Sequence, residues 1–476
     1  MDTKKLRQKI LDLAIHGKLV PQDPNDEPAS VLLERIRAEK EMLIKEGKIK
    51  APKKSKSAGD TSHYPKDVPW ELPEGWVLSN VLEVFQINPK NHEDDSTEAG
   101  FVPMANISDG FEDKYSYEVK PWKSIKSGFT HFRNGDIAVA KISPCLENRK
   151  SFVVRGLPQE VGAGTTELFI FRSGQIIPEY GLLFFKSEFF ISNCVGTFNG
   201  VVGQQRVARN IIEEMPFPIP PIAEQAKIIQ SVNSIFSMIS EVENNQSALK
   251  SSVEKSKALI LDLAIHGKLV PQDPSEEPAI ELLKRINPAF QPSHNLHYED
   301  IPQSWTVCRL SDVCVDFIVP QRDKPKIFDG DIPWCRIEDI EGKYLNGSLS
   351  GRLVSKKTIQ QMNMRICPVG TVICSCSASI GTQAIVTQPC CTNQTFIGLV
   401  PDDRFIYNEF LYYFLASQTE QFLDIGTGTT IKYISREKFE EYRIPLPPLV
   451  EQRRIVERIE YCFLLLKQIQ SATSIC

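Results

Sequence analysis

The sequence predicts an α+β protein in which two globular α/β domains are separated by a pair of long antiparallel coiled-coil helices, arranged as a pseudo-two-fold cyclic repeat. Three observations predict it. The segment ILDLAIHGKLVPQDP occurs twice, at Ile10–Pro24 and at Ile260–Pro274. Apolar residues with heptad spacing follow Glu224. The two stretches between the helices share a series of motifs, as expected for a tandem duplication.

Composition limits the class of protein. A chain of 476 residues with 41% hydrophobic and 24% charged residues suits two to four globular domains. The net charge of −5 neither favours nor excludes nucleic acid, since binding needs a local basic face. The first residues, MDTKKLRQKI, lack an apolar signal core, and the longest late apolar run is too short for a bilayer. We therefore expect a cytoplasmic protein with no membrane partner.

The cysteines indicate reduced thiols. Twelve cysteines occur, ten of them from Cys308 onward, and no pair has C-x-x-C spacing. We therefore expect no metal site and no disulfide framework.

The N-terminal region, residues 1–47, is predicted to hold two helices. The first runs from Lys4 to about Leu19, where Gly17 and Pro21 stop it. The second begins near Pro28, a residue suited to a first helical turn. Residues 48–65 are rich in Lys, Ser, Gly and Pro and read as a flexible linker.

Residues 66–221 form the first predicted domain. Strand-like runs occur at Asp136–Ile142, in SFVVRG directly afterwards, and at Glu167–Ser173. Glu179–Val195 has helical length and spacing, and a polar, Gly-containing loop follows at Gly196–Arg206. The segment closes on a Pro-rich run.

The central helical region, residues 222–290, carries the heptad pattern, broken only by Gln246 and Ser256. From Ala223 to Leu263 it would make a rod of roughly 60 Å. The predicted seam consists of Ile228, Val232, Ile235, Ile239, Val242, Leu249 and Val253.

Residues 291–448 repeat the first domain in diverged form. IPQSWTV mirrors LPEGWVL, so that Trp305 matches Trp76, and IPLPPLVEQ matches IPPIAEQ at the other end. PVGTVICSCS, NQTFIGLVP, a helical NEFLYYFLASQTEQFLDIG and the loop GTGTTIKYIS follow the order of their counterparts. The distal helix, residues 449–476, carries a second seam of Ile455, Ile459, Leu466 and Ile469.

The second rod is too short unless the start of the chain completes it. The central rod spans 35 residues from Gln225 to Ile260, whereas only 24 separate Gln452 from Cys476. The ten residues up to Ile10 nearly make up the difference. We therefore expect residues 1–47 to complete the distal helical region and the two termini to meet in space.

Two heads on a rod suit two sites on one DNA duplex, although a non-DNA scaffold with two protein-binding heads has the same geometry. The P-x-x-W openings, the P-P-[IL]-x-E-Q closings, the heptad helix and the AIHGKLVPQDP segments together resemble the specificity subunit of Type I restriction–modification systems, over the whole chain. The resemblance implies two target recognition domains, each reading half of a split sequence. It implies helices that set the spacer and dock two methyltransferase subunits, with restriction/translocase subunits joining the complex.

The resemblance also implies that loops of each domain enter the DNA grooves, prominently the loop before the closing Pro-Pro segment. Gln and Asn can pair with adenine edges, and Arg and Lys with guanine or phosphate. Simple turn residues in solvated loops are the alternative. The candidate DNA-binding residues are Lys141, Ser143, Arg149, Lys150, Thr165, Thr166, Asn199, Gln204, Gln205, Arg206, Ser375, Ser377, Gln383, Asn393, Gln394, Thr429, Thr430, Lys432 and Tyr433.

No catalytic residues are predicted. His16 and His266 lie at helix ends, where capping is the expected role, and Asn287–Phe290 reads as a linker turn. The sequence has neither a phosphate-binding loop nor a nuclease cluster. We expect a non-catalytic recognition subunit without a cofactor, in a complex that acts as adenine-N6 DNA methyltransferase and ATP-dependent endonuclease. S-adenosylmethionine, ATP and Mg²⁺ would belong to the partner subunits. A self-contained methyltransferase or nuclease is the enzyme-class alternative.

Overall fold

The computed structural model describes residues 2–49, 68–197, 205–293, 298, 300–320, 323–428 and 432–474. Most of the predicted linker at 48–65 lies outside these ranges. The chain divides into two compact units, Met1–Asn245 and Gln246–Cys476. Each unit is described by itself below; the globular part of the first is called head 1 and that of the second head 2.

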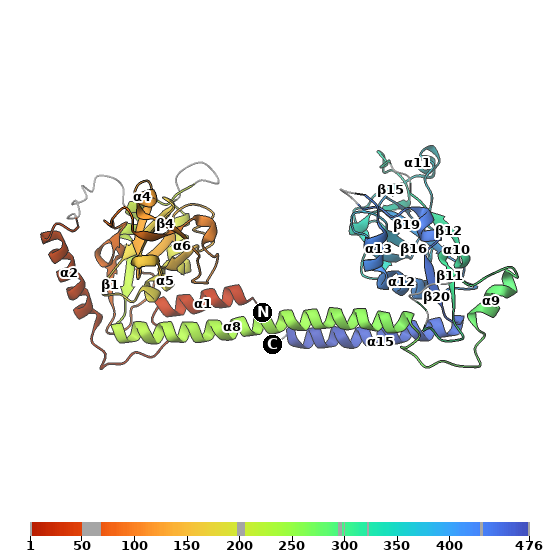
Figure 1. The fold of residues 1–476 in the computed structure, drawn as a ribbon, viewed down its shortest axis with the longest axis horizontal. Coiled ribbons are helices and arrows are strands. Elements are labelled where there is room, and N and C mark those ends of the chain that lie inside the picture. Colours follow the sequence, from red (N-terminus) through yellow and green to blue (C-terminus); the bar gives the residue numbers. More distant parts are fainter. Residues whose placement is uncertain are drawn as a thin grey trace. The chain divides into compact units, whose positions relative to one another are not determined.

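The first unit holds the N-terminal helices, head 1 and the start of the long helix (Figure 1). Its elements are α1 (Thr3–Ile15), α2 (Ala29–Lys45), β1 (Val77–Asn80), α3 (Val81–Val84), β2 (Gln86–Ile87), β3 (Glu98–Val102), η1 (Met104–Asn106), β4 (Glu118–Pro121), α4 (Trp122–Ile125), β5 (Thr130–Arg133), β6 (Ile137–Ala140), β7 (Ser151–Val153), η2 (Pro158–Glu160), β8 (Val161–Gly164), β9 (Leu168–Arg172), α5 (Pro178–Lys186), α6 (Glu188–Val195), α7 (Arg209–Glu214), β10 (Pro216–Ile219) and the first part of α8 (Ile222–Ile265).

Head 1 is built on two four-stranded sheets, ordered β2-β9-β6-β7 and β4-β3-β8-β5. All their pairings are antiparallel except that of β3 with β8. A separate ladder joins β1 to β10, so the first and last strands of the head meet directly before α8. The core is aromatic: Phe171 stacks on Phe185, and Phe85 packs edge-on against Phe217.

The second unit repeats this order. After the rest of α8 come α9 (Ala279–Ile286), β11 (Thr306–Arg309), α10 (Leu310–Val313), β12 (Cys314–Ile318), β13 (Ile332–Cys335), η4 (Ile337–Asp339), β14 (Tyr344–Leu345), β15 (Leu353–Val354), α11 (Lys356–Gln361), β16 (Val372–Ser375), β17 (Gln383–Val386), β18 (Cys391–Thr392), β19 (Phe396–Pro401), α12 (Asn408–Ser417), α13 (Thr419–Ile425), α14 (Arg436–Glu440), β20 (Arg443–Leu446) and α15 (Leu449–Ser474).

Head 2 has a five-stranded sheet, β12-β19-β16-β17-β14, and a three-stranded sheet, β15-β13-β18. The ladder of β11 with β20 closes the head before α15, as β1 with β10 does before α8. The mixture of sheets and long helices confirms the predicted α+β class. The strands expected from DIAVAKI, ELFIFRS, PVGTVICSCS and NQTFIGLVP are β6, β9, β16 and β19.

Three predicted helices are shorter or divided. The first ends at Ile15 rather than near Leu19, because Gly17 adopts a φ of +67° and Lys18 N–H donates back to the carbonyl of Leu13 at 2.9 Å. The helix expected over 179–195 is broken at Ser187, whose hydroxyl accepts from Phe190 N–H and begins α6. Its counterpart in head 2 is divided at Gln418 into α12 and α13.

The predicted central helix is confirmed as α8, which runs unbroken from Ile222 to Ile265. Within the first unit α1 lies antiparallel to the first part of α8 (Figure 1), since Arg7 bonds Glu243 while Gln22, further along the chain, bonds Glu224. Within the second unit α15 lies beside the last part of α8, and a shared apolar cluster includes Leu261, Ile455 and Ile459.

The predicted seam residues are mostly covered: Ile228, Val232, Ile239, Val253, Ile455 and Ile459 are buried, and Ile235, Leu249 and Leu466 are half-buried. Val242 and Ile469 depart from the prediction, with 39% and 49% of their surface exposed. Each lies two heptads after the first seam residue of its helix.

The repeated segment has the same role in both units: it docks a head onto the start of a long helix. In the first unit the Glu224 carboxylate accepts from the Trp76 indole at 2.9 Å and the Gln22 amide at 3.0 Å.

In the second unit Glu451 accepts from Trp305 at 3.1 Å and Gln272 at 2.7 Å. A Cβ added to Gly267 would stand 2.3 Å from Pro302, as one added to Gly17 would clash with Pro73, so both glycines are needed for close approach. We call each Trp–Glu–Gln set a clasp.

Candidate nucleic-acid interface

Three segments of head 1 meet at the end of strand β6. Lys141 N–H donates to the carbonyl of Glu167 at 3.0 Å, and Val207 N–H donates to the carbonyl of Lys141, also at 3.0 Å. Ser143 N–H donates to the carbonyl of Gln205 at 2.8 Å. The backbone therefore brings together the predicted residues that follow β6, precede β9 and precede α7. We call this the three-segment surface of head 1.

Head 2 builds the same surface with other side chains. Cys376 N–H donates to the carbonyl of Thr395 at 2.8 Å, and Ile434 N–H donates to the carbonyl of Cys376 at 2.9 Å. A β-bridge links Ser377 to Tyr433, as Ile142 is linked to Arg206 in head 1. By these contacts Tyr433 takes the position of Arg206, and Thr395 that of Glu167.

The strongest polar contact at the head 1 surface is the ion pair of Arg206 with Glu167. Nε and Nη2 of Arg206 lie 2.8 and 2.9 Å from the two carboxylate oxygens, a two-point geometry. The hydrogen bond from Arg206 lowers the pKa of Glu167. The guanidinium side chain remains 46% exposed, so it is held in one orientation while it faces solvent.

Glu167 is a residue of this surface that was not predicted from the sequence. It directly follows the predicted pair Thr165–Thr166, whose first hydroxyl accepts from Glu167 N–H at 3.2 Å. An acid next to candidate DNA contacts looks unfavourable when it is read alone. Its carboxylate instead binds the guanidinium of Arg206, which is 39 residues away in the sequence.

Lys141, Ser143, Thr165 and Gln205 are half-buried at this surface, and Thr166 is exposed. The Lys141 ammonium lies 5.3 Å from the centre of the Phe169 ring, and the Ser143 hydroxyl bonds Glu147. In head 2 the predicted residues at or near the equivalent three-segment surface are Ser377, Asn393, Gln394, Lys432 and Tyr433. Of these, Gln394, Lys432 and Tyr433 are exposed to solvent. Asn199, Gln204, Thr429 and Thr430 lie outside the described residues.

The side chains of Arg149 and Lys150, which were predicted to contact DNA, are largely buried and form hydrogen bonds inside the first unit. Arg149 bonds the carbonyl of Lys186 at 3.0 Å, the Glu188 carboxylate at 2.6 Å and Gln8 of α1, with only 10% of its side chain exposed. Lys150 donates to the carbonyls of Met104 and Ile107 at 3.2 and 3.0 Å. Their charges stabilise head 1 and its contact with α1 rather than a solvent-facing surface.

Ser375 and Gln383 are also placed differently. Ser375 is buried at the end of β16, and its hydroxyl donates to the carbonyl of Ser377 at 2.9 Å. The side-chain oxygen of Gln383 is buried and accepts no hydrogen bond from the part of the chain that the structure describes. Ser375 is thus bonded inside head 2, and Gln383 as a whole is half-buried.

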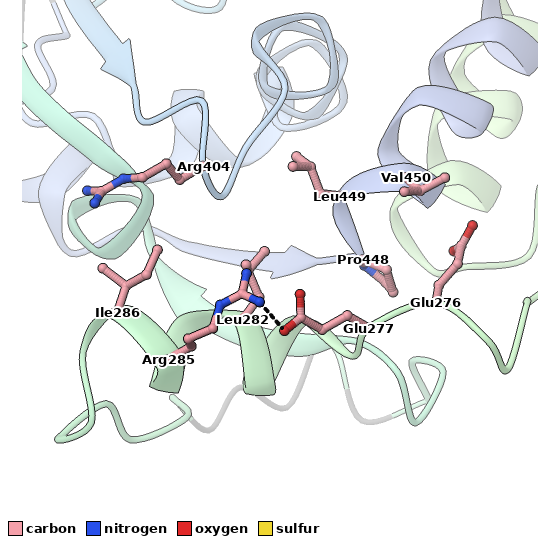
Figure 2. Close-up of a pocket in the computed structure, with 9 residues that line it drawn as sticks. All are labelled: Glu276, Glu277, Leu282, Arg285, Ile286, Arg404, Pro448, Leu449 and Val450. Carbon is pink, nitrogen blue, oxygen red and sulfur yellow. Dashed lines mark ion pairs between the residues drawn. The ribbon is translucent and has the colours of Figure 1, made fainter.

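The second unit also contains a cavity lined by charged side chains. Its volume is about 410 Å³, and Figure 2 shows its lining residues on α9 and at the start of α15. Arg285 pairs there with Glu277 at 3.0 Å, Arg404 with Asp402 and Glu276 with Arg454. The charged residues that line the cavity, Glu276, Glu277, Arg285 and Arg404, are thus all ion-paired.

The histidines of the repeat pack at helix ends. The His16 ring lies 3.9 Å from that of Trp70, and His266 Nδ1 lies 2.8 Å from the carbonyl oxygen of Asp262. Burial lowers the pKa of His16. Within the described ranges no group of three or more His, Cys, Asp or Glu side chains could hold a metal ion, and no helix is long and apolar enough to cross a membrane.

Comparison with known proteins agrees with this architecture. The family model for the Type I restriction modification DNA specificity domain matches residues 73–250 and 302–472. The chain is 34% identical to the Type I restriction enzyme EcoAI specificity subunit of Escherichia coli, over 96% of this chain and 88% of that protein. It is 31% identical to the EcoEI specificity subunit of the same organism, over 98% and 90%.

Solved structures share the fold. A chain of a type I R-M system, from a study of complex assembly and conformational transition, aligns with a TM-score of 0.64 at 21% identity, over 85% of this chain and 94% of that one. The HsdS subunit from Thermoanaerobacter tengcongensis aligns with a TM-score of 0.54 at 20% identity, over 86% and 94%. At these identities the likeness shows the fold alone.

Proposed function

Because the chain belongs to the family of Type I restriction modification DNA specificity domains, we propose that it gives such a system its DNA sequence specificity. It reads a bipartite target, with one half-site for each head. The long helices carry the heads and set the length of the spacer between the half-sites.

One observation carries this proposal: both heads present the same three-segment backbone frame with different side chains. Head 1 offers Lys141, Gln205 and Arg206, and head 2 offers Gln394, Lys432 and Tyr433. A common frame holds the segments in a common pose, while amide, guanidinium, ammonium and phenol groups select different base edges. Two heads of this kind read two different half-sequences.

The chain recognises DNA, and its partners perform the chemistry. Methyl transfer to adenine N6 and ATP-dependent cleavage fall to methyltransferase and restriction/translocase subunits, which bring S-adenosylmethionine, ATP and Mg²⁺. Such a complex acts in the cytoplasm, where the DNA is.

Apolar side chains on the long helices support docking of two methyltransferase subunits. Met238 on α8 is 61% exposed, and Tyr461 and Leu464 on α15 are each 53% exposed. Tyr461 and Leu464 lie three residues apart and therefore side by side on α15, and adjacent exposed apolar side chains of this kind are typical of a surface that a partner covers.

The decisive experiment is co-expression of the chain with a methyltransferase subunit of its own system, followed by mapping of methylated adenines. A split motif with a fixed gap is the expected result. Assembly of the complex without site-selective methylation would instead favour a scaffold with protein-binding heads. Methyl transfer by the isolated chain with S-adenosylmethionine would contradict the division of labour.

A further inference from the structure

A single lysine ties head 2 to its long helix. The Lys343 ammonium lies 3.0 Å from the carboxylate of Glu409 on α12 and donates to the carboxylate of Glu460 on α15. Lys343 itself directly precedes β14, one of the two edge strands of the five-stranded sheet. One cation therefore joins the sheet, a helix of the head and the long helix.

The groups around Lys343 stabilise its positive charge. Its side chain is 14% exposed, and the ring centres of Tyr413, Tyr344 and Tyr412 lie 4.9, 5.7 and 5.9 Å from Nζ. The Tyr344 hydroxyl donates to Glu409 at 3.1 Å. Burial lowers the pKa of Lys343, but the hydrogen bonds to Glu460 and Glu409 outweigh it and raise the pKa above its usual range.

The described residues of the first unit do not form this link. Glu179, the second residue of α5, corresponds to Glu409, the second residue of α12. Asn233, nine residues after Glu224, corresponds to Glu460, nine residues after Glu451, and so replaces a carboxylate with an amide. Glu179 pairs instead with Arg155 of head 1 at 2.6 Å, and a cavity of about 450 Å³ lies between Glu179 and Asn233.

Head 1 uses another connection to α8, through the N-terminal helix. Arg149 of head 1 bonds Gln8 of α1, and Arg7 of α1 bonds Glu243 at 2.7 Å and Ser240 at 2.8 Å on α8. The Phe111 ring of head 1 also packs 5.9 Å from that of Phe236 on α8. The two heads are thus attached to their helices by different side chains, although the clasps are the same.

We propose that Lys343 is a positioning residue that fixes the orientation of head 2 on α15, and thereby the place of the second half-site along the DNA. The inference rests on the proposed function. A desolvated cation with two carboxylate partners tolerates few geometries, because a displaced partner leaves a buried charge unpaired. Head 2 therefore resists tilting on α15, and the complex accepts one spacer length.

The test measures spacer tolerance in the assembled methyltransferase complex. After the wild-type target is mapped, substrates are made with the native gap and with gaps one and two base pairs longer or shorter. The variants are K343M and E460Q, the second of which leaves Lys343 its partner Glu409. R309M is the matched control, since Arg309 pairs with Glu441 at 3.1 Å within head 2.

Complexes with the wild-type chain or R309M are expected to methylate the substrate with the native gap almost exclusively. K343M and E460Q should raise the relative methylation of displaced gaps about threefold or more, with both half-site sequences unchanged. K343R should restore much of the selectivity. If Lys343 only stabilised the fold of head 2, its replacement would lower the yield of complex without changing the ratio of methylation at displaced and native gaps.

An unchanged gap ratio in both variants, with methylation intact, would overturn the proposal. So would loss of base preference at the second half-site with the native gap retained, because Lys343 would then act on DNA directly. If K343M does not fold, the gap ratio measured with E460Q tests the proposal by itself. Absence of site-selective methylation by wild type would be a failure of the proposed function, and it is seen before any variant is made.

Discussion

The indole nitrogen of Trp76 donates a hydrogen bond of 2.9 Å to the carboxylate of Glu224, the residue that sets head 1 on the start of α8. Trp305 and Glu451 repeat the contact in the second unit at 3.1 Å. Both carboxylates are buried, and burial raises the pKa of each. Each is kept in place by two N–H donors, one from the head and one from the repeated segment.

We predict that E224A loosens the first clasp and leaves the second intact. Removal of the acceptor leaves the buried indole N–H of Trp76 without its partner, at a cost of about 1–3 kcal/mol, whereas the exposed Gln22 amide keeps its hydrogen bond to the carbonyl of Gly17. Hydrogen exchange measured by mass spectrometry should rise in peptides that run from the first repeat past Asn25, the first residue after the repeat that differs between the copies. E451A is the matched variant for peptides that pass Ser275. Equal changes in both copies would contradict two independent clasps.

We predict that R206A weakens reading of one half-site only, by roughly tenfold or more, since a two-point guanidinium contact gives strong base discrimination. Binding of the assembled complex to duplexes with single-base changes in either half-site measures it. R209A is the control, because Arg209 forms a similar exposed pair, with Glu213 at 2.6 Å on α7. Equal loss at both half-sites would count against one head for each half-site.

We predict that the first unit gains stability as the pH rises from about 7 toward 10. Burial lowers the pKa of Lys186 to about 7, and its ammonium donates to the carbonyls of Gly110 and Arg149 at 2.9 Å each. In this window the unfolded chain binds the Lys186 proton and the folded chain does not. Raising the pH therefore favours the folded state, by up to about 1.4 kcal/mol for each pH unit. Below pH 7 both states carry the proton, and this dependence is lost.

Thermal unfolding at pH 7, 8 and 9 tests the role of Lys186. Wild type should show the rise, and K186M should show a flatter profile because it has no proton to lose. A slope that is equal in the two proteins would assign the pH dependence to other groups.

We predict that four residues inserted into α8 near Gln246 lengthen the spacer and leave both half-sites unchanged. Four residues add about 6 Å of helix, close to two base pairs at about 3.4 Å each. Mapping of methylated adenines in the assembled complex reads the new gap. The same insertion at the exposed turn of Gly351 in head 2 is the control. A changed half-site sequence with an unchanged gap would refute a spacer role for α8.

The sequence by itself determined the duplication, the long helix and the central strands β6, β7, β9, β16 and β19. These depend on local patterns: the identical segments at Ile10 and Ile260, the heptads of α8, and short apolar runs such as that of β6. It also located the three segments that meet in each head. Side-chain burial could not be obtained in this way. Arg149 and Lys150 look like DNA contacts in sequence, yet they are bonded within the first unit.

Only the tertiary structure decided which charges are paired. Glu167 meets Arg206 across 39 residues, and Lys343 meets Glu460 across 117. The energy of a charged side chain depends on its distance from other charges and from water, and distant parts of a chain set both. Residue type and local spacing fix neither quantity. The duplication can therefore be recognised in the sequence, whereas the side-chain contacts that attach each head to its helix cannot.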